Sequence, residues 1–378
     1  MPTTLPESGR AAVVAAWGEP LSLREYPLSP PPPGALLVAV ERTTVCGSDV
    51  HAWEGAYAEH FGVEPPIMLG HEIVGRVVAF GEGPRVDSVG TPLAAGDRVV
   101  WEHEACGRCF FCSVERNASL CENRRIGFLV STEEAPHFHG GFGEYSYVWP
   151  RSGRLRVPDE VGSSLAAAAS CALRSAIPAV ARLGPVDFTD TVVVQGTGPL
   201  GLFATAVFAT HSPRRLIVIG APEERLAVAR AWGADETISL EQHPSREERL
   251  ELVQAATEGR GASVVGEFSG GRDAVAEGID LVAPNGRYVV AGSLGGPEQA
   301  LAAQKIALKN LTIVGSLGAE IDSYYKALEF LRSQRNRFEW DLLLGADHSL
   351  GEATEALRRM QRFEEIKAVL DPSLPWSS

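Results

Sequence analysis

The sequence predicts a mixed α/β protein with two domains, a partly open β domain and a domain built on a doubly wound parallel sheet. Residues 1–160 are rich in Gly and Pro and in short stretches of alternating apolar residues, whereas apolar runs alternate with helical stretches over 161–315. At 378 residues, with 45% hydrophobic and 22% charged side chains, the chain is long enough for about two hydrophobic cores.

Short alternating segments at 35–45, 72–83 and 96–101 predict strands of the β domain. The Pro-rich tract at 29–34 predicts a rigid surface turn between them. These segments surround the first chemically distinctive residues of the chain.

Three separated segments carry a possible catalytic metal site. Cys46 stands three residues before Asp49, His71 and Glu72 follow Gly70, and Cys171 lies in Ala-Ser-Cys-Ala. One His and two Cys are a ligand set of catalytic zinc, which keeps a fourth position for water or substrate. A carboxylate such as Asp49 would accept the imidazole N–H that points away from the metal and so orient the ring. Glu72 is a further candidate ligand.

A second group of cysteines crowds into sixteen residues. It consists of Cys106, Cys109, Cys112 and Cys121. Short Cys-x-x-Cys loops direct sulfurs at one centre, and four thiolates around one ion are a usual form of structural zinc. We therefore expect one structural zinc here, in addition to one catalytic zinc at Cys46, His71 and Cys171.

The second half begins with a glycine motif. Gly196, Gly198 and Gly201 follow an apolar run at 191–195 and open a helical stretch, which is the context of a dinucleotide-binding turn. Further apolar runs follow it. They lie at 216–219, 236–240, 263–268, 287–291 and 311–315, so that six parallel strands are predicted.

The choice between NAD and NADP depends on the residues after the second of these strands. Gly220 stands where NAD-binding units usually have an acid for the ribose hydroxyls. Glu223 and Glu224 disfavour a 2′-phosphate, and Arg225 is the only base nearby. We expect NAD, with Glu223 or a backbone group at the ribose and Arg225 beside it.

These motifs resemble the zinc-containing medium-chain alcohol dehydrogenases over nearly the whole chain. The matching features are Cys-Gly-Ser-Asp with a His two residues on, Gly-His-Glu, the four cysteines, the later lone cysteine and the glycine motif. One departure is an extra residue between Cys112 and Cys121. The resemblance implies a GroES-like catalytic domain that residues 316–378 rejoin, a Rossmann domain over 161–315, and hydride transfer between a primary or secondary alcohol and NAD(P).

The resemblance also implies roles for single residues. Ser48 and His51 match a proton relay from the substrate to solvent, and Ser175 matches a residue beside the nicotinamide. Lys367 matches a basic residue that contacts the pyrophosphate. A homodimer or homotetramer is expected of the family.

Composition limits the other possibilities. With 34 basic and 48 acidic residues the net charge is −14, which argues against nucleic acid as a partner. Because no run of about 20 continuous apolar residues and no signal-like N-terminus is evident, we expect a cytoplasmic protein without a membrane partner. Its partner would be a small alcohol or carbonyl compound.

Three functions remain open at this stage. The first is an alcohol dehydrogenase. The second is a polyol or sugar dehydrogenase or a biosynthetic carbonyl reductase, which would use the same residues. The third is a non-catalytic sensor that binds zinc and nucleotide, although an intact set of candidate ligands and relay residues disfavours it.

Overall fold

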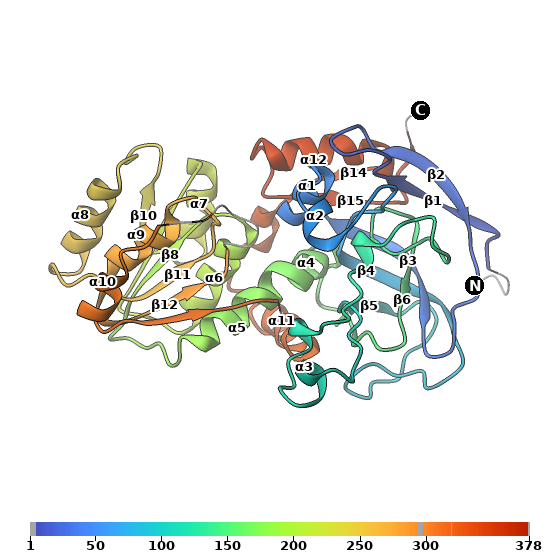
Figure 1. Cartoon of the computed structure of the whole chain (residues 1–378), viewed down its shortest axis with the longest axis horizontal. Coiled ribbons are helices and arrows are strands. Elements are labelled where there is room, and N and C mark those ends of the chain that lie inside the picture. Colours follow the sequence, from blue (N-terminus) through green and yellow to red (C-terminus); the bar gives the residue numbers. More distant parts are fainter. Residues whose placement is uncertain (1–4, 293–297, 299, 319, 377–378) are drawn as a thin grey trace. The chain divides into compact units, whose positions relative to one another are not determined.

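The computed structural model describes residues 5–292, 298, 300–318 and 320–376, and the chain divides into two compact units (Figure 1). The first unit comprises Met1–Cys171, Ala319–Arg335 and Leu344–Ser378, and the second comprises Ala172–Gly318 and Asn336–Leu343. The predicted α/β class, with one β domain and one doubly wound domain, is confirmed. The predicted boundaries after 160 and 315 differ from this division, and 336–343 was expected in the other domain.

The first unit is built on a mostly antiparallel sheet, in which only β14 and β15 pair in parallel among the described strands, and the end of the chain contributes to it. Among the described residues its strand order is β14 (Leu344–His348), β15 (Lys367–Leu370), β3 (Leu36–Thr44), β4 (Glu72–Phe80), β5 (Arg98–Trp101) and β7 (Arg154–Arg156), with β6 (Tyr145–Val148) also on β3. A separate hairpin pairs β1 (Ser8–Val13) with β2 (Ser22–Pro27). Because β15 pairs with β3, residues far apart in the chain share one sheet.

Helices close the faces of this unit. They are α1 (Gly47–Trp53), α2 (Ala58–Phe61), α3 (Phe110–Ser113), α4 (Ser163–Ala168), α11 (Ile321–Ser333) and α12 (Ala353–Gln361), with short 3₁₀ turns at Ala118–Leu120, Gly127–Leu129 and Leu350–Glu352. On α12 the buried residues are Ala353, Ala356, Leu357 and Met360. This i, i+3, i+4, i+7 spacing places one apolar face against β15 and α1.

The second unit has the predicted six-stranded parallel sheet. Its order is β10 (Glu236–Ser239), β9 (Arg215–Gly220), β8 (Thr191–Gln195), β11 (Ala262–Glu267), β12 (Val282–Val290) and β13 (Thr312–Gly315). The helices are α5 (Arg174–Arg182), α6 (Pro199–Thr210), α7 (Glu223–Ala231), α8 (Arg246–Ala256), α9 (Ala274–Leu281) and α10 (Ala303–Leu308). Numbered from β8, the order is 3-2-1-4-5-6, that of a dinucleotide-binding sheet, in which ligands bind at the carboxyl ends of the strands.

An aromatic cluster explains why residues 336–343, which contain the 3₁₀ turn Trp340–Leu343, belong to the second unit. Trp232 lies 4.9 Å from Trp340 between ring centroids and 6.3 Å from Phe338, and its indole N–H donates to the carbonyl of Glu339. Periodicity within a short segment cannot reveal such a contact, because its partners are about a hundred residues away.

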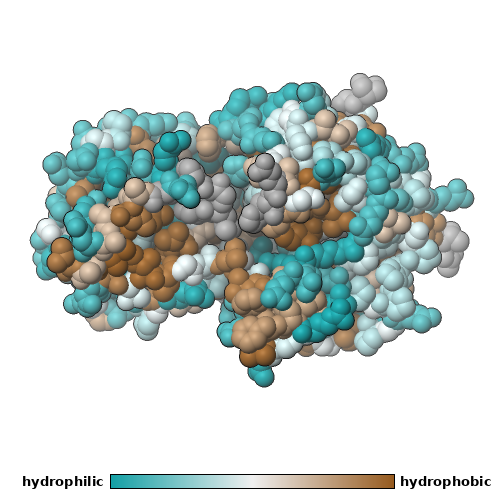
Figure 2. All heavy atoms as spheres, in the orientation of Figure 1, coloured by the Kyte–Doolittle hydropathy of each residue, from teal (hydrophilic) through white to brown (hydrophobic). Residues whose placement is uncertain are grey.

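The surface of the second unit includes an apolar patch over α10 and β12 (Figure 2). Leu301, Leu308 and Leu317 are large apolar residues with exposed side chains around α10 and β13, and β13 is the last strand in the described sheet order.

The stretch Ser163–Arg182 is long and apolar enough to pass a simple test for a membrane-spanning helix. Most of it is buried inside the structure, and it includes the buried Arg174. It therefore has the character of a core helix, and its apolar average comes from alanines rather than from a continuous run of large apolar residues.

Candidate functional site

The residues proposed for the first metal site come together in the first unit. Cys46 directly precedes α1, His71 directly precedes β4, and Cys171 lies in a π-helical segment, Ala169–Leu173, that follows α4. The ligand atoms of these three residues and of Glu72 all lie within 4.8 Å of one another. π-helical turns are frequent at functional sites, and this one carries the last of the four groups.

Asp49 ties two of these segments together. Its carboxylate accepts the backbone N–H of Cys46 at 2.8 Å and that of Gly70 at 3.0 Å, and it lies 3.2 Å from His71 Nδ1. As the third residue of α1 it also closes the start of the helix. The Asp49 side chain is fully buried, so this arrangement holds the imidazole with Nε2 as the nitrogen left for a metal.

The electrostatics of the cluster suit a cation. A hydrogen bond with Cys171, followed by burial, raises the pKa of Cys46 to about 11. Burial alone would lower the pKa of His71, but the Asp49 carboxylate and the Cys46 sulfur outweigh it and raise the pKa to about 10. Two sulfurs this close repel each other as thiolates, and a divalent cation would remove that repulsion and displace the imidazole proton. The donor set therefore fits zinc.

Lys367 lies beside the acidic member of this cluster. Its ammonium is buried, 1% exposed, and lies 2.6 Å from both carboxylate oxygens of Glu72. Thr44 also donates to Glu72. This engagement by Glu72 argues against the implied pyrophosphate contact, because the strand that carries Lys367 pairs with β3 and directs the charge into the core of the first unit.

The same contacts affect the pKa values of Glu72 and Lys367. Burial raises its pKa to about 7, although the Lys367 ammonium opposes the shift. Burial acts against the charge of Lys367 as well, yet the Glu72 carboxylate outweighs it and raises the Lys367 pKa. Because both carboxylate oxygens contact the ammonium at 2.6 Å, the two side chains form an ion pair.

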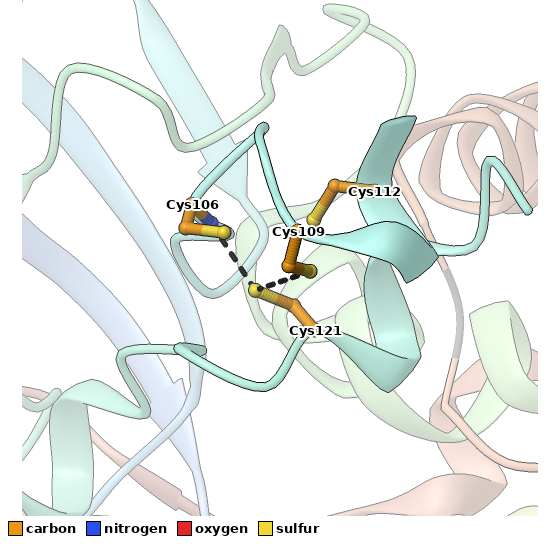
Figure 3. A group of neighbouring side chains, drawn as sticks. All are labelled: Cys106, Cys109, Cys112 and Cys121. Carbon is orange, nitrogen blue, oxygen red and sulfur yellow. Dashed lines mark hydrogen bonds between the residues drawn. The ribbon is translucent and has the colours of Figure 1, made fainter. Parts of the chain in front are cut away.

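The four clustered cysteines also meet at one point. Figure 3 shows their side chains facing one another around α3. The Cys109 and Cys121 sulfurs are 3.9 Å apart, close to the roughly 3.8 Å expected for two ligands 2.3 Å from a tetrahedral zinc. The backbone N–H of Cys106 donates to the Cys121 sulfur at 3.2 Å, and none of the six cysteines is in a disulfide.

Thiol acidity in this lobe follows from the turns that carry the cysteines. The backbone N–H of Arg108, with that of Cys109, outweighs desolvation and lowers the pKa of Cys106 to about 6. Desolvation and the neighbouring thiols Cys109 and Cys121 raise the pKa of Cys112. Four thiolates cannot coexist here without a cation, so the lobe also fits zinc.

The glycine motif forms a tight turn at the carboxyl end of β8. Gly196 has φ +113°, a conformation that favours glycine, and Gly198 precedes α6. A Cβ on Gly201 would lie 2.1 Å from the Gly196 carbonyl oxygen, so only glycine lets the helix approach the turn. The N-terminus of α6 can therefore receive a pyrophosphate.

The residues proposed to select the cofactor lie after β9. A Cβ on Gly220 would lie 2.4 Å from the Thr197 methyl group, so Thr197 fills the space of the usual acid. Glu223 is exposed in the first turn of α7 and pairs with Arg230. Arg225 is buried, 5% exposed, and desolvation lowers its pKa.

Comparison with known proteins identifies the family. Residues 32–159 match the model of the alcohol dehydrogenase GroES-like domain, and 199–333 match that of the zinc-binding dehydrogenase. The 5-exo-hydroxycamphor dehydrogenase of Pseudomonas putida is 35% identical, over 93% of this chain and 95% of that protein. The sorbitol dehydrogenase of Halalkalibacterium halodurans is 30% identical, over 93% and 95%. The structure of an alcohol dehydrogenase from Thermotoga maritima matches with a TM-score of 0.88 and 33% identity, over 97% of this chain and 100% of that one. The chain belongs to the zinc-containing medium-chain dehydrogenases.

As a member of this family the dehydrogenase is an oxidoreductase acting on CH–OH groups, with zinc and a nicotinamide dinucleotide as cofactors. The relay and nicotinamide residues implied by the resemblance have the following positions. Ser48 is half-buried in the first turn of α1, and the His51 side chain is 58% exposed near its end. Ser175 is half-buried in the first turn of α5.

Two rings beside the metal cluster were not predicted from the sequence. Phe128 packs at 4.6 Å from the His71 ring, and His103 lies 6.3 Å from the same ring. Their positions near the cysteine lobe gave no periodic signal. Two other histidines, His137 and His139, have ring nitrogens 2.8 Å from the backbone carbonyls of Thr132 and Glu134, respectively.

Proposed function

We propose that this dehydrogenase is a zinc-dependent alcohol dehydrogenase that interconverts an alcohol and its carbonyl compound, with NAD as the preferred cofactor. The proposal rests on the ion pair between Glu72 and Lys367. Lys367 contacts both oxygens of Glu72, so the carboxylate is already neutralised. The remaining ligands are Cys46, His71 and Cys171. Three protein ligands leave one position of a tetrahedral zinc for substrate, as catalytic sites require.

The chain's own residues then have separate parts in the reaction. Zinc in this site would act as a Lewis acid on the substrate oxygen, and the nicotinamide would exchange hydride with the neighbouring carbon. Asp49 holds His71 in the orientation that keeps Nε2 toward the metal. Ser48 takes the proton from the substrate, and the exposed ring of His51 passes it to water.

The residues around the end of β9 support NAD. Glu223 and Glu224 occupy the first turn of α7, where their charges would repel a 2′-phosphate. Since Thr197 excludes an acid at position 220, we assign the ribose hydroxyls to Glu223 or to backbone groups of the turn. Arg225 flanks this contact from the buried side of the helix.

A ring-bearing apolar alcohol is the substrate class that we favour. The relative with 35% identity is named for a hydroxycamphor, and Phe128 places an apolar ring against His71. Polyols are the alternative, because another relative is a sorbitol dehydrogenase. A non-catalytic sensor is disfavoured, since the ligands and the relay pair are all present.

Cytoplasmic location and assembly into a homodimer or homotetramer remain predictions. The exposed leucines Leu301, Leu308 and Leu317 near the edge strand β13 support self-association.

The proposal is tested by following the near-ultraviolet absorbance of reduced nicotinamide with NAD and NADP separately. The panel contains alicyclic, aromatic and linear alcohols and polyols. We expect turnover with alicyclic alcohols and NAD, its loss after chelation, and its recovery when zinc is restored. Metal analysis should find zinc in both clusters of the wild type, and in the four-cysteine lobe alone after Cys46→Ser.

Silence across the panel in the zinc-loaded protein would contradict the proposal and favour the sensor. A Cys121→Ser variant is the matched control for loss of a sulfur ligand, because it removes the other zinc. Activity that persists in Cys46→Ser would refute the assignment of the catalytic ligands.

A further inference from the structure

A buried carboxylate joins two loops at the carboxyl ends of the central strands of the second unit. Glu267 is the last residue of β11, and its side chain is fully buried. Oε1 accepts the backbone N–H of Ser269 at 2.7 Å, the Ser269 hydroxyl at 2.8 Å and the backbone N–H of Gly270 at 2.6 Å. Oε2 accepts the backbone N–H of Gly292, after β12, at 3.1 Å. The side chain therefore joins the loop after β11 to Gly292, where it adds to the bond that the Glu267 backbone carbonyl accepts from the same N–H at 3.0 Å.

The first of these loops lies against the dinucleotide turn. A Cβ on Gly196 would meet the N, Cα and Cβ atoms of Ser269 at 3.0 Å. The backbone N–H of Phe268 donates to the carbonyl of Gln195, directly before that turn, at 2.9 Å. The position of the Ser269 loop thus limits the space in front of Gly196, where a dinucleotide would lie in this sheet order.

We infer that Glu267 is a positioning residue of the dinucleotide site, which fixes the Ser269 loop and Gly292 beside the glycine turn. The inference rests on the proposed function, because it assigns the carboxyl end of this sheet to the cofactor. Glu267 itself is fully buried, so it would act through these loops rather than on the cofactor. The donors named above are groups that it holds in place, and a neutral amide cannot accept from all of them, since one of its two polar atoms is a donor.

The test is the variant Glu267→Gln, with the dissociation constant of NADH measured by fluorescence titration without alcohol. We expect this constant to rise about tenfold, because a Ser269 loop that Glu267 no longer fixes must be ordered when the cofactor binds. The KM for NAD should rise by a similar factor, whereas the KM for the alcohol should not change. Ser269→Ala, which removes one donor, should act in the same direction with a smaller effect, and it decides the question if Glu267→Gln does not fold.

Asp190→Asn is the matched control. Asp190 is also a largely buried acid of this sheet, paired with Arg287 at 3.1 Å, but it precedes β8 at the amino end of the strand. It should lower the melting temperature without changing the NADH constant. An unchanged NADH constant in Glu267→Gln, or an equal rise in Asp190→Asn, would overturn the inference. Wild-type protein that binds NADH but oxidises no alcohol would count against the proposed function alone, and wild-type protein that binds no dinucleotide would overturn both.

Discussion

The Lys367 ammonium and the Glu72 carboxylate form an ion pair in the core of the first unit, with 1% and 0% of the side chains exposed. Removing one member of such a pair leaves an uncompensated buried charge, which costs about 3–5 kcal/mol, whereas replacing both members is often nearly neutral. Glu72 lies in the same cluster as Cys46, His71 and Cys171, so a change in this ion pair alters both the charge of the metal site and the stability of the fold.

Replacing Lys367 with Met should therefore lower the free energy of unfolding by about 3–5 kcal/mol, and adding Glu72→Gln should restore most of the loss. The dissociation constant of NADH should stay unchanged in the folded variant, because Glu72 already engages the ammonium in the core of the first unit. Urea unfolding and NADH titration measure the two quantities. A weaker NADH complex at unchanged stability would instead support the phosphate contact.

Local spacing made most of the candidate site predictable at this scale. Four cysteines within sixteen residues can meet only around a small centre, and the pattern Cys46 to Asp49 closes the start of one short helix. The burial of Lys367 could not be predicted in the same way, since it depends on the pairing of β15 with β3, more than three hundred residues apart in the chain.

At the scale of elements, the turn after β8 packs closely against the end of β9. The Thr197 hydroxyl donates to the carbonyl of Ala221 at 2.8 Å, and its side chain fills the space beside Gly220. An acid at position 220 would thus need a change in the neighbouring turn as well. This fit explains how the sheet can lack the usual ribose carboxylate.

We predict that Gly220→Asp alone destabilises the protein by about 1–3 kcal/mol, as overpacking of a close contact does. The double variant with Thr197→Gly should recover stability and raise the preference for NAD over NADP about tenfold, because a carboxylate at this position repels the 2′-phosphate. Thermal unfolding and kcat/KM with each cofactor are the measurements, and Thr197→Gly alone is the control. Full stability of Gly220→Asp would contradict the steric argument.

The six strands of the second unit were predictable because each is a short apolar run whose signal is local. The segment 336–343 was not, since only the packing of Phe338 and Trp340 on Trp232 assigns it to this unit. The pairing of Glu267 with two loops also escaped prediction, although an acid at the end of the apolar run 263–268 was visible in the sequence.

At the scale of the whole molecule, one buried histidine couples folding to pH. His139 is 5% exposed; its Nε2 lies 2.8 Å from the Glu134 carbonyl, and within the described residues Nδ1 has no hydrogen-bond partner. Burial lowers its pKa to about 4, against about 6.5 in an unfolded chain. The unfolded state therefore binds more protons between these values, so that stability is complete above about pH 6.5 and falls as the pH decreases toward 4. Burial raises the pKa of Glu102 to about 6, which acts in the opposite direction with a smaller shift.

Replacing His139 with Gln keeps a donor for the Glu134 carbonyl and removes the titrating group. Between pH 7 and pH 5 the wild type should lose about 2 kcal/mol more stability than His139→Gln, as the two pKa values imply. Urea unfolding of both proteins at a series of pH values, each without metal so that zinc release is not measured, gives the difference directly. The contribution of Glu102 and of the thiols cancels in this comparison, because both proteins contain them. Parallel stability curves for the two proteins would show that the imidazole gains its proton in the folded state as easily as in the unfolded chain, and that its burial does not govern the acid sensitivity of the fold.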